Sequence, residues 1–182
     1  MRAFIGIEVT DEVRAALTDA QKKLARCPAK VKWVRPANMH LTLKFLGDVD
    51  EPTVARVKAA MADAAGGGPF AFAVRGLGTF PPRGAPRVVW AGVSGGADAA
   101  TKLQARLEDA LRPMGFEKER SFVPHLTIGR VKDPKGAREL TAMVECDAGT
   151  KFGLCTAAEM VLFESTLTPQ GAIYGAVARQ AL

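Results

Sequence analysis

Only two histidines occur in the 182 residues, and each begins the same tripeptide, His40-Leu41-Thr42 and His125-Leu126-Thr127. The similarity extends one residue further, because Leu43 corresponds to Ile128. Similarity of fixed length at two places is the signature of an internal repeat. Imidazole takes up or releases a proton near neutral pH, so two histidines in equivalent settings could supply a general base and a general acid to one reaction.

Both motifs are predicted to lie on β-strands, because they are short, rich in apolar residues and alternating. Side chains at i and i+2 share a face, which places His40 beside Thr42 and His125 beside Thr127 and turns the neighbouring apolar residues toward a core. A lone histidine is more often structural, and threonine is common in strands for its β-propensity alone. The repetition with the same polar partner favours catalysis, with each threonine hydroxyl available to a substrate oxygen.

Basic residues surround the motifs in a chain of net charge +6, which suits a substrate that carries phosphate. Lys44 has the strand parity of His40 and is expected to face the same site, although an ordinary surface lysine is the alternative. Arg130 would point away from His125 in an ideal strand, so a twist or the end of the strand must redirect it. The basic residues that flank or lie near the motifs are Arg35, Lys44, Arg83, Arg87, Arg130 and Lys132.

The remaining pattern mixes strands and helices without strict βαβ alternation, which predicts an α+β fold with largely antiparallel sheets. Thr10 or Asp11 is expected to cap the first helix, and Pro52 to open the second. Strands are expected near residues 2–8, 31–34, 40–46, 70–76, 88–93, 150–156, 159–166 and 172–179, and the second motif strand is expected to begin at His125 and to reach Gly129. Helices are expected near residues 11–26, 51–65, 98–112 and 136–145.

Several classes of protein are disfavoured by composition. No apolar run approaches the length of a membrane span, and the N-terminus reads as a strand rather than a signal peptide, so a cytoplasmic protein is expected. Cys27, Cys146 and Cys155 lack the spacing of a zinc site or a disulfide framework, and we expect no metal. Neither a Rossmann nor a P-loop glycine pattern is present. The length fits one compact unit over residues 1–182.

The chain resembles the 2H phosphoesterase superfamily, in particular the RNA 2′,3′-cyclic phosphodiesterases of bacteria and archaea once called 2′-5′ RNA ligases. That family carries the pattern H-x-T/S-x twice. Further stretches that resemble it are Trp33-Val34-Arg35-Pro36, Lys44-Phe45-Leu46-Gly47, Gly129-Arg130, and 167–174. The resemblance covers nearly the whole chain and implies a bilobal fold with pseudo-two-fold symmetry. Each lobe would supply one histidine strand to a shared cleft, without metal or cofactor.

The activity implied by this resemblance is metal-independent hydrolysis of RNA 2′,3′-cyclic phosphate ends, tRNA fragments included, to a 2′-phosphomonoester by a monomeric enzyme. On that basis His40 is the general acid and His125 the general base, with Thr42 and Thr127 binding the phosphate. Arg130, Lys44 and Arg35 are candidate substrate contacts. Three readings stay open: a 2′-5′ RNA ligase, a non-catalytic module that binds RNA ends, and a hydrolase of small cyclic phosphates.

Overall fold

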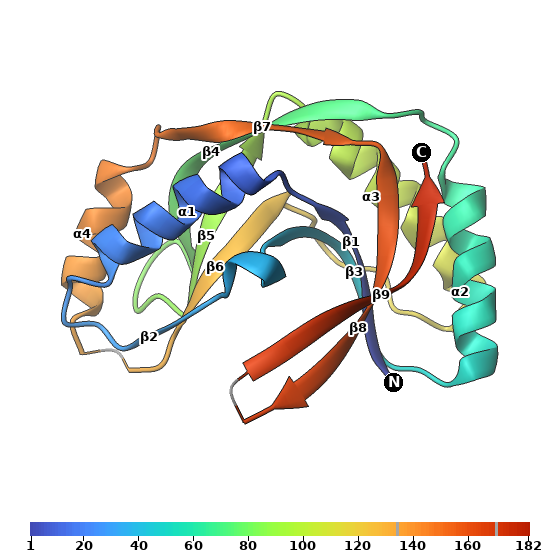
Figure 1. The fold of residues 1–182 in the computed structure, drawn as a ribbon, viewed down its shortest axis with the longest axis horizontal. Helices are drawn as coiled ribbons and strands as arrows, with labels where there is room; N and C mark the ends of the chain where they lie inside the picture. The colour runs from blue at the N-terminus through green and yellow to red at the C-terminus, as the bar shows by residue number, and fades with distance from the viewer. Residues whose placement is uncertain (134, 170) are drawn as a thin grey trace.

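The computed structural model describes residues 1–133, 135–169 and 171–182. Figure 1 gives the order of the elements along the chain. The strands are β1 (Arg2–Glu8), β2 (Val31–Trp33), β3 (His40–Asp48), β4 (Phe70–Phe80), β5 (Val88–Ser94), β6 (His125–Val131), β7 (Lys151–Ala157), β8 (Glu159–Thr168) and β9 (Gly171–Ala181). The helices are α1 (Asp11–Leu24), α2 (Glu51–Ala64), α3 (Ala97–Leu111) and α4 (Ala137–Cys146), with short 3-10 turns η1 (Pro36–Asn38) and η2 (Arg112–Met114).

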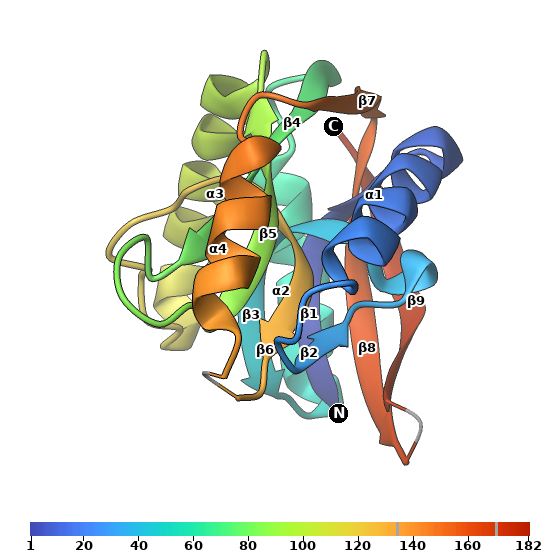
Figure 2. The ribbon, with the colours of Figure 1, turned by 90° about the vertical axis from the view of Figure 1, so that its left-hand side faces the viewer.

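The strands form two antiparallel sheets, with the orders β3-β1-β8-β9 and β2-β6-β5-β4-β7. The α+β class with antiparallel sheets is therefore confirmed. Each sheet holds one of the two histidine strands: β3 is the edge of the first sheet, and β6 lies between β2 and β5 in the second. The chain passes from one sheet to the other several times, so the two sheets are built from interleaved parts of the sequence (Figures 1 and 2).

Local sequence accounts for where the first two helices begin. The Thr10 hydroxyl caps α1 by accepting from the backbone N–H of Val13 at 3.3 Å. At α2, the carboxylate of Asp50 accepts from the N–H of Thr53 at 2.9 Å, and Pro52 occupies the first turn, where its missing N–H costs nothing. Both caps satisfy N–H groups that the helices themselves leave unpaired.

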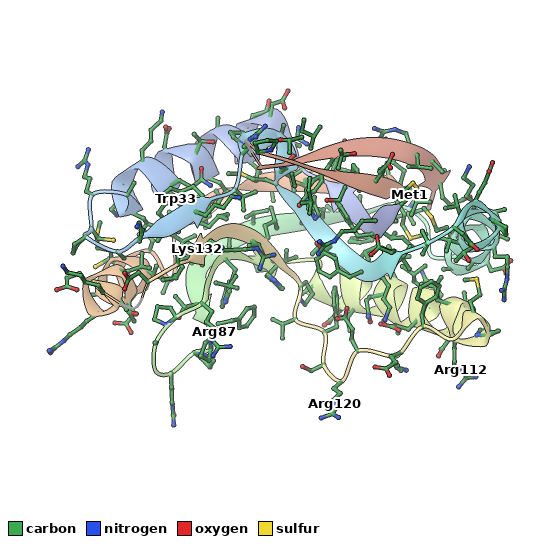
Figure 3. All side chains as sticks on the ribbon, turned by 90° about the horizontal axis from the view of Figure 1, so that it is seen from below. Met1, Trp33, Arg87, Arg112, Arg120 and Lys132 are labelled. Atoms are coloured by element: carbon green, nitrogen blue, oxygen red, sulfur yellow. The ribbon has the colours of Figure 1, made fainter. Side chains whose placement is uncertain are left out.

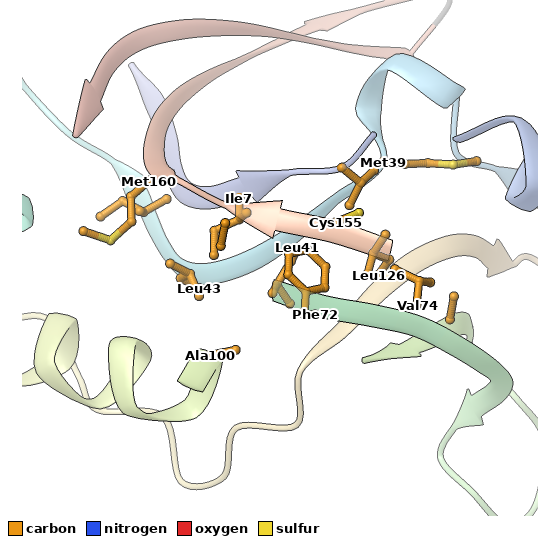
Figure 4. Packing of buried hydrophobic residues seen from close by; sticks show 14 of the residues in the cluster. Ile7, Met39, Leu41, Leu43, Phe72, Val74, Ala100, Leu126, Cys155 and Met160 are labelled. Carbon is orange, nitrogen blue, oxygen red and sulfur yellow. The ribbon is translucent and has the colours of Figure 1, made fainter. Parts of the chain in front are cut away.

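The core lies between the helices and the inner faces of both sheets. Leu41 and Leu43 on β3 and Leu126 on β6 are at most 1% exposed and pack in one cluster with Ile7 and Phe72 (Figure 4). Burying each of these side chains stabilises the fold by roughly 1.5–3 kcal/mol. The predicted alternation is thereby confirmed for the two motifs, because the apolar residues of each strand are fixed in the core while the histidine and threonine remain partly accessible.

The hairpin formed by β8 and β9 projects away from the rest of the molecule in both views (Figures 1 and 2). Its second strand is tied to η1, because the Asn38 side-chain amide donates to the Ala172 carbonyl at 2.8 Å. In the part of the chain that the structure describes, no helix is both long enough and apolar enough to cross a bilayer.

Candidate active site

The two motif strands come together at one cleft. β3 and β6 contact each other where the two sheets meet, and Thr42 and Thr127 both line the hollow between them. His40 lies on one side of this hollow. His125 lines an adjoining hollow of about 310 Å³ that again includes both threonines. The structure thus brings together the four residues that the repeat singles out.

Each motif strand contains a β-bulge at the third residue after its histidine. In β3, Ile5 of the neighbouring strand pairs with Lys44 and Gly6 pairs with Thr42, so Leu43 is passed over. In β6, the pairing moves from Thr127 to Gly129 in the same way and passes over Ile128. A bulge adds one residue to a strand and reverses the alternation beyond it. The residue five positions after each histidine is therefore turned to the face of the cleft.

The bulges decide which flanking residues reach the site. Arg130 lines the hollows beside both histidines, although an ideal strand would turn it away, and the bulge is what redirects it. Its equivalent on β3 is Phe45, which is 59% exposed and borders the same hollows. Sequence reasoning missed Phe45, although its position five residues after His40, matching Arg130 after His125, is a signal that was available.

The expectation that Lys44 faces the site is wrong. Its side chain is only 4% exposed and lies on the opposite face of β3, where Nζ donates to both carboxylate oxygens of Glu108 at 2.9 and 3.0 Å. It also donates to the Glu117 carbonyl. The same Glu108 carboxylate accepts from the N–H of Glu119. Lys44 therefore anchors the segment before β6, which forms one wall of the cleft, and is not among the residues that line the hollows beside the two histidines.

Hydrogen bonds and aromatic contacts hold the ring of His40 in place. Nδ1 donates to the Asn38 carbonyl at 2.7 Å, since a carbonyl oxygen only accepts, and the Thr42 hydroxyl lies 2.8 Å from Nε2. The imidazole stacks on Phe4 at 4.6 Å between ring centres and meets Tyr174 edge-on at 5.4 Å. Gly6 permits this, because a Cβ there would lie 3.2 Å from Cδ2 of His40.

This environment disfavours the protonated, positively charged form of the His40 imidazole. Burial, the largest cause, lowers the pKa of the His40 imidazole from 6.5 to about 4, and the positive charges of Arg14 and His125 act in the same direction. The hydrogen bond to the Asn38 carbonyl opposes the shift without cancelling it. His40 is therefore neutral at pH 7 in the free protein, with the lone pair of Nε2 facing the Thr42 hydroxyl.

His125 shares the backbone anchor of His40 but has different neighbours. Its Nδ1 donates to the Val123 carbonyl at 2.7 Å, which leaves Nε2 as the reactive nitrogen. Phe80 and Trp90 pack edge-on to the ring, at 5.0 and 6.5 Å between centres. Glu119 lines the same hollow, and burial raises the pKa of its carboxyl group. No motif or spacing in the sequence singles out Glu119.

The other basic residues named from the sequence lie around the cleft rather than in its lining. The guanidinium of Arg35 lies close to Gly171 at the start of β9, while its neighbours Val34 and Asn38 line the hollow beside His40. Arg83 and Arg87 occupy the loop whose ends, Phe80 and Val88, border the hollow beside His125. Figure 3 shows Arg87 on this loop and Lys132 just beyond β6.

Metal-binding side chains do not gather in the cleft. Across residues 1–133, 135–169 and 171–182, no group of three or more histidine, cysteine, aspartate or glutamate side chains is arranged to hold a metal ion. The cleft is lined instead by two imidazoles, two threonine hydroxyls and the guanidinium of Arg130, with the carboxyl group of Glu119 on the side of His125. Such a set can move protons and bind a phosphate oxygen.

Known proteins resemble this chain over almost its full length. An RNA 2′,3′-cyclic phosphodiesterase of Methanothermobacter thermautotrophicus is 38% identical over 175 residues, which cover 96% of this chain and 95% of the relative. One from Thermotoga maritima is 38% identical over 180 residues, covering 96% and 91%. A crystal structure of a Thermus thermophilus protein superposes with a TM-score of 0.84 at 30% identity, covering 100% of this chain and 98% of the other.

The family described as LigT like phosphoesterase matches residues 7–90 and again residues 92–174. The first match contains His40 and the second contains His125. Together with the identity to full-length relatives, these matches establish that the chain belongs to the LigT-like family of 2H phosphoesterases.

Proposed function

We propose that this chain hydrolyses 2′,3′-cyclic phosphate ends of RNA to 2′-phosphomonoesters without a metal ion. The observation that carries the proposal is the pair of HxT strands at one cleft, each with its histidine Nδ1 bonded to a backbone carbonyl. In this arrangement Nδ1 of each ring is held by its hydrogen bond to the backbone, and Nε2 of each ring remains for proton transfer. The relatives that bear the name RNA 2′,3′-cyclic phosphodiesterase support the substrate class.

The reaction needs two proton transfers on opposite sides of the phosphorus. One imidazole removes a proton from water as its oxygen forms the new bond to phosphorus, and the bond from phosphorus to the ribose 3′ oxygen breaks. The second imidazole gives a proton to that departing oxygen, so the product is a 2′-phosphomonoester and a free 3′ hydroxyl. Positioned proton transfer of this kind contributes roughly 10²–10⁴-fold to a rate.

The setting of His40 favours it as the base. Its lowered pKa of about 4 keeps Nε2 unprotonated at neutral pH in the free enzyme, as a base requires. We therefore assign His40 to water activation and His125 to protonation of the leaving 3′ oxygen. This assignment is the opposite of the one that the resemblance implies, in which His40 is the acid and His125 the base.

Thr42, Thr127 and Arg130 are assigned to the phosphate. Two hydroxyls and a guanidinium face the hollow between the histidines, where the non-bridging oxygens gather charge as the new bond forms. Thr42 donates to His40 Nε2 in the free protein, so its hydroxyl must turn to the phosphate when substrate enters. Arg130 has the planar fork of donors that suits two phosphate oxygens at once.

The apolar part of the hollow beside His125 is assigned to the reacting nucleoside. Phe45, Phe80 and Phe122 line it together with the partly exposed Val123. Nucleobases stack on aromatic side chains with little regard to sequence, typically for about 1–3 kcal/mol per base. A base held there would place its ribose next to His125 and the two threonines.

The experiment is an assay of EDTA-treated protein with an RNA oligonucleotide ending in 2′,3′-cyclic phosphate, with the product isomer identified by phosphorus NMR. We expect undiminished turnover after EDTA treatment and a 2′-phosphate. Loss of activity that added Mn²⁺ or Zn²⁺ restores would contradict the metal-free mechanism, and binding without turnover would indicate an RNA-end-binding module. A second arm with a 5′-hydroxyl RNA detects ligation, which would appear as a joined strand.

A further inference from the structure

A third hollow, of about 480 Å³, shares Phe45 and Arg130 with the hollow beside His125 but is not lined by His125 itself. Its walls come from β1, β3 and the β8–β9 hairpin, and from Arg130 across the cleft. The residues that matter for its chemistry are Arg2, Phe45, Arg130, Ser165, Leu167 and Tyr174. Its volume is within the range of ligand pockets and suits one nucleotide.

The hollow is continuous with the reaction cleft. Phe45 and Arg130 border it, the hollow beside His40 and the hollow beside His125. Tyr174 lines both this hollow and the one that contains His40. A chain molecule whose end is held between the two histidines can therefore extend over Phe45 into this space without leaving the surface.

The hollow beside His125 and the hollow beyond Phe45 differ in charge. This difference favours one direction for a nucleic-acid strand bound across both. The hollow beside His125 holds the carboxyl group of Glu119 against a single guanidinium, that of Arg130, and its outer part is lined by apolar side chains, which suits a base and disfavours a second phosphate. The hollow beyond Phe45 contains two guanidinium groups and no carboxylate among its described lining residues. Within the described part of the chain, neither Arg2 nor Arg130 forms an ion pair, so both cations are available to an anion.

The floor of this hollow is aromatic. Phe4 is 3% exposed and supports it from below, with ring centres 6.0 Å from Phe45, 4.8 Å from Tyr174 and 4.6 Å from the imidazole of His40, so the accessible aromatic surface is that of Phe45 and Tyr174. Leu167 adds an exposed apolar side chain, 68% accessible, on the hairpin. Aromatic surface next to guanidinium groups is the combination with which proteins hold single-stranded nucleic acid.

We propose that this hollow is a subsite for the nucleotide immediately 5′ of the reacting one. Arg2 binds the phosphodiester that joins the two nucleotides, and the penultimate base stacks against the exposed ring of Phe45 near Leu167. The subsite rests on the proposed function, and it deepens that proposal by making a strand of two or more nucleotides a better substrate than a cyclic mononucleotide.

The test compares kcat/KM for a 2′,3′-cyclic mononucleotide with that for a dinucleotide ending in the same cyclic phosphate. For the wild type we expect the dinucleotide to be preferred by roughly 10-fold or more, from one stacked base and one charge-assisted phosphate contact. Arg2→Gln should reduce that preference by roughly 5- to 10-fold. Arg112→Gln is the matched control, because it removes the same charge from an exposed position on η2 after α3 and should leave the preference unchanged.

A dinucleotide with a neutral methylphosphonate linkage completes a thermodynamic cycle. If Arg2 binds the linking phosphate, this substrate loses the same factor with the wild type, and Arg2→Gln costs nothing further. Equal kcat/KM for mononucleotide and dinucleotide would refute the subsite while leaving the proposed function intact. Equal losses in Arg2→Gln and Arg112→Gln would also refute it, because the charge would then act only as general surface potential. Absence of turnover with both substrates would instead contradict the proposed function.

Discussion

The stability of the folded chain should depend on the protonation of His40. The change is acidification, from about pH 7 to about pH 5, and the matched perturbation is His40→Gln, which keeps a polar side chain of similar size but cannot titrate. Burial lowers the pKa of His40 from 6.5 to about 4. As pH falls below 6.5, the unfolded chain therefore binds a proton that the folded chain still rejects, and the free energy of unfolding must decrease.

The magnitude follows from the two pKa values. With 6.5 for the unfolded chain and about 4 for the folded one, His40 alone lowers the free energy of unfolding by about 2 kcal/mol between about pH 7 and pH 5. The loss approaches about 3 kcal/mol below pH 4, where both states are protonated. Well above pH 6.5 neither state carries the proton, and the contribution of His40 no longer changes with pH.

The assay is urea unfolding of the wild type and His40→Gln at several pH values, with the difference between the two proteins as the readout. This difference removes the effect of other groups, including Glu119, whose raised pKa acts in the opposite direction. His125→Gln is the control and should retain most of the pH dependence that His40→Gln loses, because the burial that is the largest cause of the His40 shift remains. If the wild type and His40→Gln lose stability in parallel, His40 is not held neutral by its surroundings, and its assignment as the base loses its support.

Three further outcomes are expected. Lys44→Ala should lower the free energy of unfolding by about 3–5 kcal/mol in urea denaturation, because it leaves Glu108 buried without its cation; a change below about 1 kcal/mol would contradict the buried pair. Thr127→Val should reduce kcat by roughly 10²-fold with little change in stability, and unaltered kcat would remove Thr127 from the phosphate site. Turnover of an RNA oligonucleotide below saturation should fall more steeply with salt than that of a cyclic mononucleotide, and Arg83→Ala or Arg87→Ala should flatten the oligonucleotide slope; equal salt slopes for both substrates would assign these charges to the general surface.

Much of the fold could be predicted because the local signals agree with one another. Hydrophobic periodicity, capping residues and helix-breaking residues predict the ends of α1, α2, α3 and α4 to within about two residues of those observed. The strands follow one another along the chain in the predicted order. The repeat placed two histidines and two threonines on the accessible faces of two strands, where the structure has them. These features depend on neighbouring residues and need no long-range information.

The errors arise where strand pairing overrides local pattern. Strict alternation of side chains along a strand predicts that Lys44 faces the cleft and that Arg130 faces away from it. A bulge in each strand makes both predictions wrong. A bulge is set by pairing with a neighbouring strand, so the motif alone does not reveal it. The aromatic surroundings of His40 could not be predicted either, because Phe4, Phe163 and Tyr174 come from strands distant in sequence.

The measurement that tests the paired-histidine mechanism most directly is single-turnover hydrolysis of an RNA 2′,3′-cyclic phosphate by His40→Ala and His125→Ala, in the presence of EDTA. Each variant is expected to lose several orders of magnitude in rate while remaining folded and binding the RNA at about pH 7, since each removes one of two proton transfers worth roughly 10²–10⁴-fold. A rate close to the wild-type rate in either variant, with metal excluded, would contradict the mechanism.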